Sequence, residues 1–62
     1  GPTAQQVVEA DIARQEETVA ELERELAEDW GNADLLRKHR AARDELQSLL
    51  VRWEQLFESP VR

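Results

Sequence analysis

The residues best placed to do chemistry are the bases of the run Arg37-Lys38-His39-Arg40, which Arg43 continues. On a helix, Arg37 and Arg40 share an outward face, with Lys38 on one flank and Arg43 along the other edge. Four cations this close together suit contacts to the phosphates of DNA or ribosomal RNA. The sequence therefore marks Arg37, Lys38, Arg40 and Arg43 as candidate nucleic-acid-binding residues.

The same bases have a second interpretation, in which they balance acidic residues of the chain itself. An antiparallel fold would bring Lys38 to Glu25 and Arg43 to Glu16, and the remaining bases would neutralise the carboxylates at Glu28 and Asp29. A third opposite-charge pair, Asp11 with Arg52, is expected in the same arrangement. Such pairs fix the register of two helices more than they stabilise it.

Neither a catalytic site nor a metal site is expected. The chain has no cysteine and one histidine, and it lacks a glycine-rich phosphate loop. The carboxylates that could serve in acid–base chemistry read as a solvated helix face, because nothing apolar encloses them; they are Glu16, Glu17, Glu21, Glu23 and Glu25. His39 could gain a charge near pH 6 and act as a sensor, but a half-buried seam aromatic is the preferred interpretation. We expect no enzyme activity and no cofactor.

Two helical stripes must position these residues. Apolar residues recur with alternating steps of four and three on both sides of Gly31, the rhythm of a coiled-coil seam. When the chain folds back between Trp30 and Gly31, the stripes come into register, and the residue numbers of every facing pair have the same sum. The pairs are Leu26 with Leu35, Leu22 with His39, Val19 with Ala42, Gln15 with Leu46, Ile12 with Leu49 and Val8 with Trp53; Leu56 extends the second stripe.

The pattern predicts an all-α fold, an antiparallel two-helix coiled-coil hairpin. We expect the first helix over residues 3–29, a turn at 30–32, the second helix over 33–58, and a tail at 59–62 that begins before Pro60. Thr3 and Gln6 form a capping box, Gly31 closes the first helix in the left-handed conformation, and Asn32 or Asp34 caps the second. Gly1-Pro2 resembles the scar of a cleaved expression tag, so we expect a fragment of a longer protein.

Charge divides unevenly between the two helices. Residues 3–29 hold nine acidic residues and two arginines, whereas residues 30–62 hold six bases and five acidic residues, and the whole chain carries −6. An acidic total argues against general nucleic-acid binding and limits such contact to the basic cluster. The sequence has neither a signal peptide nor a long apolar run, which favours a cytoplasmic protein without a membrane partner.

Each helix also carries a column of residues beside its seam, spaced seven apart. The apolar column of the second helix is Leu36, Leu50 and Phe57, with Arg43 interrupting it, and the alanine column of the first helix is Ala13, Ala20 and Ala27. Either the parent protein covers these columns, or two fragments pair into a four-helix bundle.

Trp30 either plugs the end of the coil or forms a further protein contact, and packing is preferred.

Finally, the chain resembles a known family. The run Leu22-Glu-Arg-Glu-Leu-Ala27, a turn with an aromatic residue, and the ending Arg52-Trp53-Glu54-Gln55-Leu56 resemble the C-terminal coiled coil of ABC-F ATPases, particularly Uup-like members. The resemblance implies a non-catalytic arm that follows the second ATP-binding cassette of a cytoplasmic ATPase. It also implies contact with nucleic acid, since family members act on ribosomes and the Uup-like branch associates with DNA, including branched DNA, through this domain.

Overall fold

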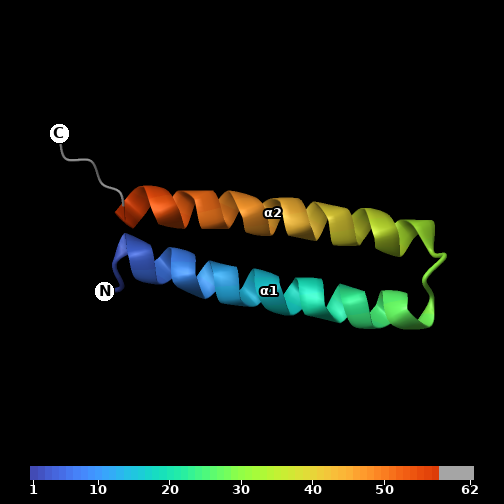
Figure 1. Ribbon diagram of the computed structural model, residues 1–62. Helices are drawn as coiled ribbons and strands as arrows, with labels where there is room; N and C mark the ends of the chain where they lie inside the picture. Colours follow the sequence, from blue (N-terminus) through green and yellow to red (C-terminus); the bar gives the residue numbers. More distant parts are fainter. Residues whose placement is uncertain (58–62) are drawn as a thin grey trace.

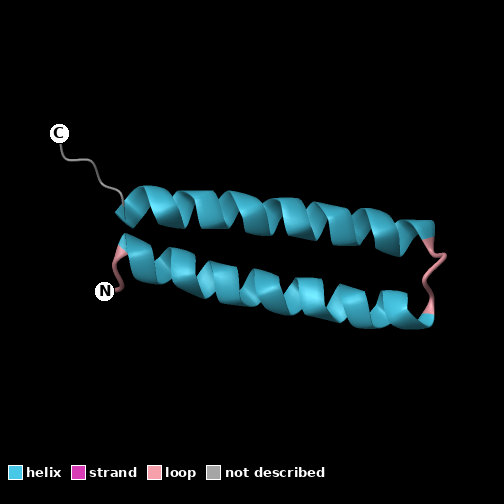
Figure 2. Cartoon of the chain, in the orientation of Figure 1, coloured by secondary structure: helices cyan, strands magenta, loops and turns pink. Residues whose placement is uncertain are grey.

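The chain forms two helices that lie side by side and run in opposite directions. The computed structural model describes residues 1–57, with α1 over Ala4–Glu28 and α2 over Ala33–Phe57. A short connection at 29–32 joins them at one end, and the start of α1 and the end of α2 meet at the other (Figures 1 and 2). The described part of the chain contains no strand. The predicted all-α helical hairpin is confirmed.

The capping box at the start of α1 is confirmed. The amide of Gln6 donates to Oγ1 of Thr3 at 3.1 Å, and the amide of Thr3 donates to Oε1 of Gln6 at 3.0 Å. Two backbone donors that the first helical turn leaves without partners are thereby satisfied. The expected first residue of this helix, Thr3, is its cap.

Asn32 caps α2, which settles the choice between Asn32 and Asp34. Its Oδ1 accepts from the amides of Asp34 and Leu35 at 2.9 and 3.1 Å. Its Nδ2 donates to Oδ2 of Asp29 at 2.9 Å, and its own amide donates to the Asp29 carbonyl at 3.0 Å. One side chain therefore starts α2 and ties it to the end of α1.

The expectation for Gly31 is wrong, because no glycine has a positive φ in the described residues. The chain leaves α1 at Asp29, whose φ of −146° and ψ of 59° are not helical, while its amide still donates to the carbonyls of Glu25 and Leu26. The change of direction is thus made at Asp29 and closed by Asn32. A left-handed residue is not needed.

The seam lies along the predicted stripes. Val8, Ala42 and Leu49 are buried, and the other seam residues are half-buried, except for Leu56, which is exposed. Two contacts between the helices set their register: Trp53 Nε1 donates to Glu9 Oε2 at 3.0 Å, and His39 Nε2 lies 3.1 Å from Glu23 Oε2. Both lie within one residue of the predicted pairing of Trp53 with Val8 and of His39 with Leu22.

The hairpin is a narrow rod with extents of 49 × 24 × 13 Å. The helix bounds agree with the expected ones to within one residue wherever the chain is described. The expected end of the second helix at Glu58, its stop at Ser59-Pro60 and the tail at 59–62 lie outside the described residues. Neither α1 nor α2 has a stretch apolar enough to cross a membrane.

Candidate interaction surfaces

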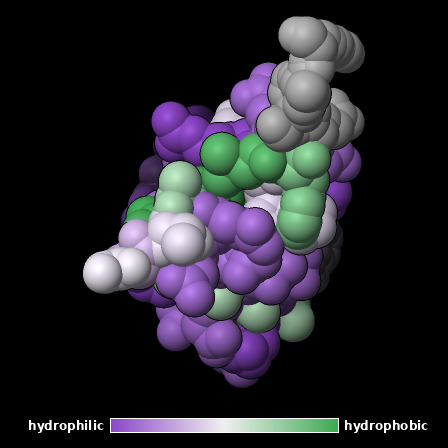
Figure 3. Space-filling model, turned by 90° about the vertical axis from the view of Figure 1, so that its left-hand side faces the viewer, coloured by the Kyte–Doolittle hydropathy of each residue, from purple (hydrophilic) through white to green (hydrophobic). Residues whose placement is uncertain are grey.

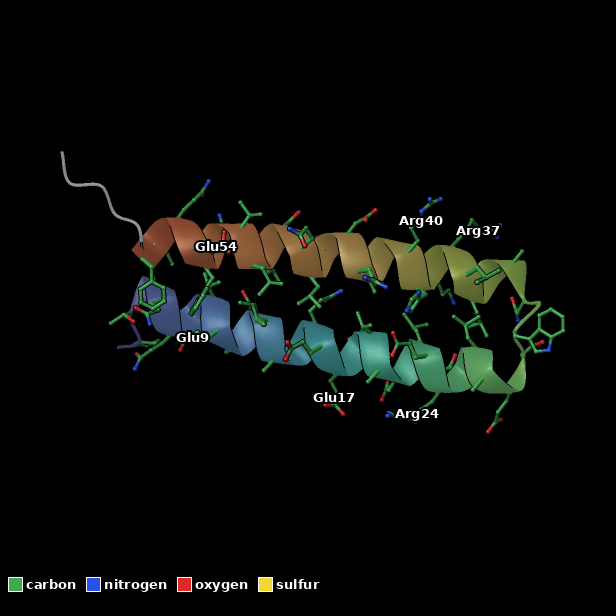
Figure 4. The ribbon with its side chains drawn as sticks, viewed as in Figure 1. Glu9, Glu17, Arg24, Arg37, Arg40 and Glu54 are labelled. Carbon is green, nitrogen blue, oxygen red and sulfur yellow. The ribbon has the colours of Figure 1, made fainter. Side chains whose placement is uncertain are left out.

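The basic cluster lies on the first half of α2, close to the turn, and all four of its side chains are exposed. Arg37 and Arg40 project from the side of α2 that faces away from α1 (Figure 4). Glu17 and Arg24 project from the opposite outer side, on α1. The basic cluster of α2 and the outward side chains of α1 therefore lie on opposite outer sides of the hairpin.

Two of the four bases share a carboxylate within their own helix. Arg37 Nη2 lies 2.9 Å from Asp34 Oδ1, and Lys38 Nζ lies 3.7 Å from Asp34 Oδ2. Asp34 stands in the first turn of α2, where a negative charge also favours the helix dipole. The two bases nearest the turn are thus partly neutralised, whereas Arg40 and Arg43 have no ion-pair partner within residues 1–57.

The three predicted ion pairs between the helices are not formed by the described side chains. Lys38 contacts Asp34 instead of Glu25, and Asp11 contacts Arg14 instead of Arg52. The carboxylate or base that each residue contacts instead is three or four residues away on the same helix, where little side-chain entropy is lost in reaching it. The third predicted pair, Glu16 with Arg43, is absent between α1 and α2 as described.

Trp30 stands at the turn with 81% of its surface exposed, so the preferred expectation that it packs against the coil is wrong. It precedes Gly31 in the connection, beyond the last seam pair of Leu26 and Leu35, and no further turn of helix extends over it. This end of the rod therefore combines an exposed indole with the bases of α2 and the carboxylates of Glu28, Asp29 and Asp34. Such a combination is typical of contact surfaces.

The apolar column of α2 is largely uncovered. Leu36 and Phe57 are 49% and 53% exposed, and Leu50 is half-buried. Apolar side chains are gathered at the end of the rod where α1 begins and α2 ends, as Figure 3 shows. Trp53 and Phe57 pack there edge to face, with ring centroids 4.6 Å apart and an angle of 84° between their planes.

An apolar groove of about 220 Å³ runs beside this column, and its walls come from both helices. Glu9 and Ile12 of α1 and Leu50 and Trp53 of α2 line it. Glu9 and Leu50 therefore stand on the same side of the hairpin, which we call the contact face. Because Glu16 and Glu23 follow Glu9 at seven-residue intervals, the acidic column of Glu9, Glu16 and Glu23 borders this face along α1.

The alanine column lies next to the acidic column. Ala13, Ala20 and Ala27 each follow an acidic residue by four positions, one helical turn further on. Ala20 is half-buried, and Ala13 and Ala27 are exposed. Apart from Ile12 of the seam, which lines the groove with Leu50, the first helix thus offers carboxylates and small residues to the contact face.

Two polar contacts across the seam share a pattern that the sequence interpretation missed. Glu9 and Glu23 each come one residue after a seam position, and each contacts the aromatic ring that faces that position, Trp53 or His39. The signal was present in the sequence, because both glutamates sit beside a predicted partner of an aromatic residue. His39 itself is a half-buried seam residue, as preferred.

Hydrogen bonding favours the charged form of the Glu9 carboxyl. The indole of Trp53 is the largest influence and Nε2 of Gln5, at 3.2 Å, the second, so the pKa of Glu9 lies below its ordinary value of 4.5.

Further along the seam, Gln15 Nε2 donates to the carbonyl of Ala42 at 3.0 Å. Gln15 thus makes a third polar contact between the two helices.

Among residues 1–57, histidine and carboxylate side chains form no group of three that could hold a metal ion. The described surfaces comprise an apolar and acidic face on one side, and bases with an indole near the turn. No protein-family model, curated protein or solved structure matches the chain.

Proposed function

We propose that this chain is a non-catalytic coiled-coil hairpin that associates with a second copy through the contact face, giving a four-helix bundle. The observation that carries the proposal is the uncovered apolar column of α2. Leu36 and Phe57 expose about half of their surface, and Leu50 lines an open groove. The opposing positions on α1 are glutamates, so the hairpin cannot cover the column itself.

The small core supports the same conclusion. Val8, Ala42 and Leu49 are the buried core residues of the described chain. Chains below about 70–80 residues seldom gain enough from one core and commonly add a disulfide, a metal or a second subunit. This chain has no cysteine. A second copy would bury Leu36, Leu50 and Phe57, and burying one such side chain contributes about 1.5–3 kcal/mol.

Sedimentation equilibrium of the wild type, Leu50→Glu and Val51→Glu tests the proposal. Val51 is exposed, neighbours Leu50, and takes the same charge on the outer side of α2, so it is the matched control. We expect the mass of a dimer for the wild type and Val51→Glu, and that of a monomer for Leu50→Glu.

Circular dichroism establishes whether each variant is helical, and Leu36→Glu repeats the test further along the column if Leu50→Glu does not fold. A monomeric wild type would overturn the proposal and would mean that another segment covers the face. Equal masses for folded Leu50→Glu and wild type would overturn it as well.

A second candidate function rests on the turn end of the rod. The exposure of Trp30 and the outward direction of Arg37 and Arg40 support contact with nucleic acid there. Under the resemblance to Uup-like ABC-F proteins, the hairpin would be an accessory arm that targets a cytoplasmic ATPase to DNA or ribosomal RNA. Asp34 weakens this candidate, because it occupies two of the four bases.

Binding to duplex and branched DNA at two salt concentrations tests this candidate. The variant reverses Arg37, Lys38 and Arg40 to glutamate, and a control of equal net charge reverses Arg14, Arg24 and Arg52. If the turn end binds, the first variant binds more weakly and its salt slope falls by about one for each phosphate that it no longer neutralises, while the control keeps both. Equal behaviour of the two variants would exclude the turn end as the binding surface.

A further inference from the structure

The contact face has two unlike halves, which limits how it can pair with a copy of itself. Its α1 half carries the acidic and alanine columns, and its α2 half carries the apolar column and Arg43. A two-fold axis in the plane of the interface can run along the helices or across them. Along the helices, it lays α1 of each copy over α2 of the other; across them, it lays α1 over α1 and α2 over α2.

The charges that face each other across the interface differ between these two arrangements. With the axis across the helices, the acidic column of one copy faces the acidic column of the other, and like charges brought together at an interface are strongly unfavourable. With the axis along the helices, the carboxylates of α1 face Arg43 of the other copy. Arg43 has no ion-pair partner within the described chain.

The positions of the side chains along the long axis of the hairpin also favour a two-fold axis parallel to the helices. The contacts of Glu9 with Trp53 and of Glu23 with His39 fix how far along α1 each residue of α2 lies. By that register, Leu50 stands within one residue of the height of Ala13, and Leu36 within one residue of the height of Ala27. An axis parallel to the helices keeps these heights equal in the two copies.

The large and small columns then match across the interface. Leu50 of one copy meets Ala13 of the other, and Leu36 meets Ala27, so each large side chain lies against a small one and the helices approach closely. At mid-height, the same register places Arg43 near the height of Ala20, with Glu16 of the other copy about one helical turn away and within reach of the long arginine side chain. The arginines and glutamates alternate around the axis, which turns the charged interruption of the apolar column into an attractive ring.

We infer that two copies pair in parallel, with both turns at the same end and with α1 of each lying against α2 of the other. This inference rests on the proposed self-association and adds its direction and its residue pairing. It assigns the alanine column as the docking surface for Leu36 and Leu50, and it assigns Arg43 and Glu16 as the charges that select the orientation.

Spin labels on introduced cysteines test the direction, because the chain has no cysteine of its own. Gly31→Cys is suited to this, since its φ is not positive and a Cβ there meets nothing within 4 Å. Gly1→Cys, equally unobstructed, labels the other end. With helices packed 8–10 Å apart, the parallel pair puts two Gly31 labels roughly 20–30 Å from each other.

The opposite arrangement puts those labels near the full length of the rod, 49 Å. A mixture of chains labelled at Gly31 and at Gly1 then gives the short distance, whereas in the parallel pair this mixture gives the long one. A dimeric mass with a long distance between Gly31 labels would overturn the inference but leave the proposed function standing. A monomeric mass would overturn the proposed function itself.

A charge exchange tests the pairing independently. Arg43→Glu puts glutamates at every position of the ring, and we expect its dimer dissociation constant to rise ~10-fold. Adding Glu16→Arg restores the alternation with the signs reversed and should bring the constant back to that of the wild type. The control Arg52→Glu changes the charge of α2 equally, away from the contact face. An unchanged constant in Arg43→Glu, or no recovery in the double variant, would contradict the pairing.

Discussion

The two ends of the rod are built from different kinds of contact. At the open end, where the chain is not continuous between the helices, Val8 and Leu49 are buried, Trp53 packs edge to face on Phe57, and the indole of Trp53 reaches Glu9. At the turn end the contacts are mainly polar. Asn32 caps α2 and holds Asp29, His39 meets Glu23, and the one large aromatic residue of the connection, Trp30, is exposed.

The difference follows from chain continuity. Near the turn, the loop joining two facing residues is short, so little chain entropy is lost when they meet, and a few hydrogen bonds hold them. At the open end the loop contains nearly the whole chain, and only stronger apolar burial compensates for closing it. The comparison predicts that substitutions at the open end cost the most stability and that substitutions in the turn change it locally.

The largest effect is expected for Leu49→Ala, which removes a buried side chain from the open half of the seam. We expect the free energy of unfolding to fall by about 2–3 kcal/mol, the lower part of the range for such truncations, because the cavity lies near solvent. Urea denaturation followed by circular dichroism, at one fixed protein concentration, measures it. Val51→Ala, on the outer side of the same helix, is the control, and a loss there equal to that of Leu49→Ala would contradict the assigned seam.

The next effect is expected at the turn, for Asn32→Ala. Without Oδ1, the amides of Asp34 and Leu35 lose their acceptor, and the loss of a helix cap costs about 1 kcal/mol. The same denaturation experiment measures it. Asn32→Ser keeps an acceptor oxygen and should recover most of the loss. If serine is no better than alanine, the cap is not what holds this end.

A smaller change, of opposite sign, is expected for Gly31→Ala. Since φ is not positive at Gly31 and its Cβ direction is open, alanine fits the folded chain and restricts the unfolded one. The expected gain in the free energy of unfolding is about 0.4–1 kcal/mol. A loss of stability would show that the turn does require the left-handed conformation that the sequence first suggested.

The smallest expected effect is a dependence of folding stability on pH, which arises from Glu9 at the open end. Because the pKa of Glu9 is lower in the folded chain, its contribution to stability is present above about pH 4.5 and is lost as the pH falls through the folded pKa. Glu9→Gln should therefore melt with less dependence on pH below 4.5 than the wild type does. Thermal melts at pH 3 and pH 7 measure this.

Two further variants test whether the contact between Glu9 and Trp53 causes this pH dependence. Trp53→Phe removes the donor that lowers the pKa most, and the Glu9 carboxyl, followed by nuclear magnetic resonance, should then titrate closer to its ordinary value. Glu17→Gln, on the outer side of α1, removes a carboxylate without touching this contact. If Glu17→Gln reduces the acid dependence as much as Glu9→Gln does, the Trp53 contact is not its source.

The fold and its register could be predicted from the sequence, because apolar periodicity fixes which faces meet and the turn fixes where they start. Val8, Ala42 and Leu49 are buried on the predicted stripes, and the contacts of Trp53 and His39 fall within one residue of their predicted partners. The capping box and the Asn32 cap could be predicted for a related reason. Each depends on residues only three positions apart.

The details of charge and of the turn could not be predicted in the same way. Lys38 had two acidic residues within reach, Glu25 across the seam and Asp34 on its own helix, and the choice depends on small differences in side-chain entropy. Gly31 permits several conformations, so its presence does not select one. Trp30 was expected to pack, but the connection is so short that nothing extends beyond the last seam pair to receive it.

The conformation of Gly31 also bears on how this rod could be elaborated. A backbone that ordinary residues can adopt, in open space and between two firmly paired lengths of helix, imposes no chemical demand on what stands there. A foreign peptide or a small inserted module could be grafted at that point, with both of its ends held together by the stem. The hairpin would then serve as a handle, and its tip as a place where new recognition is displayed.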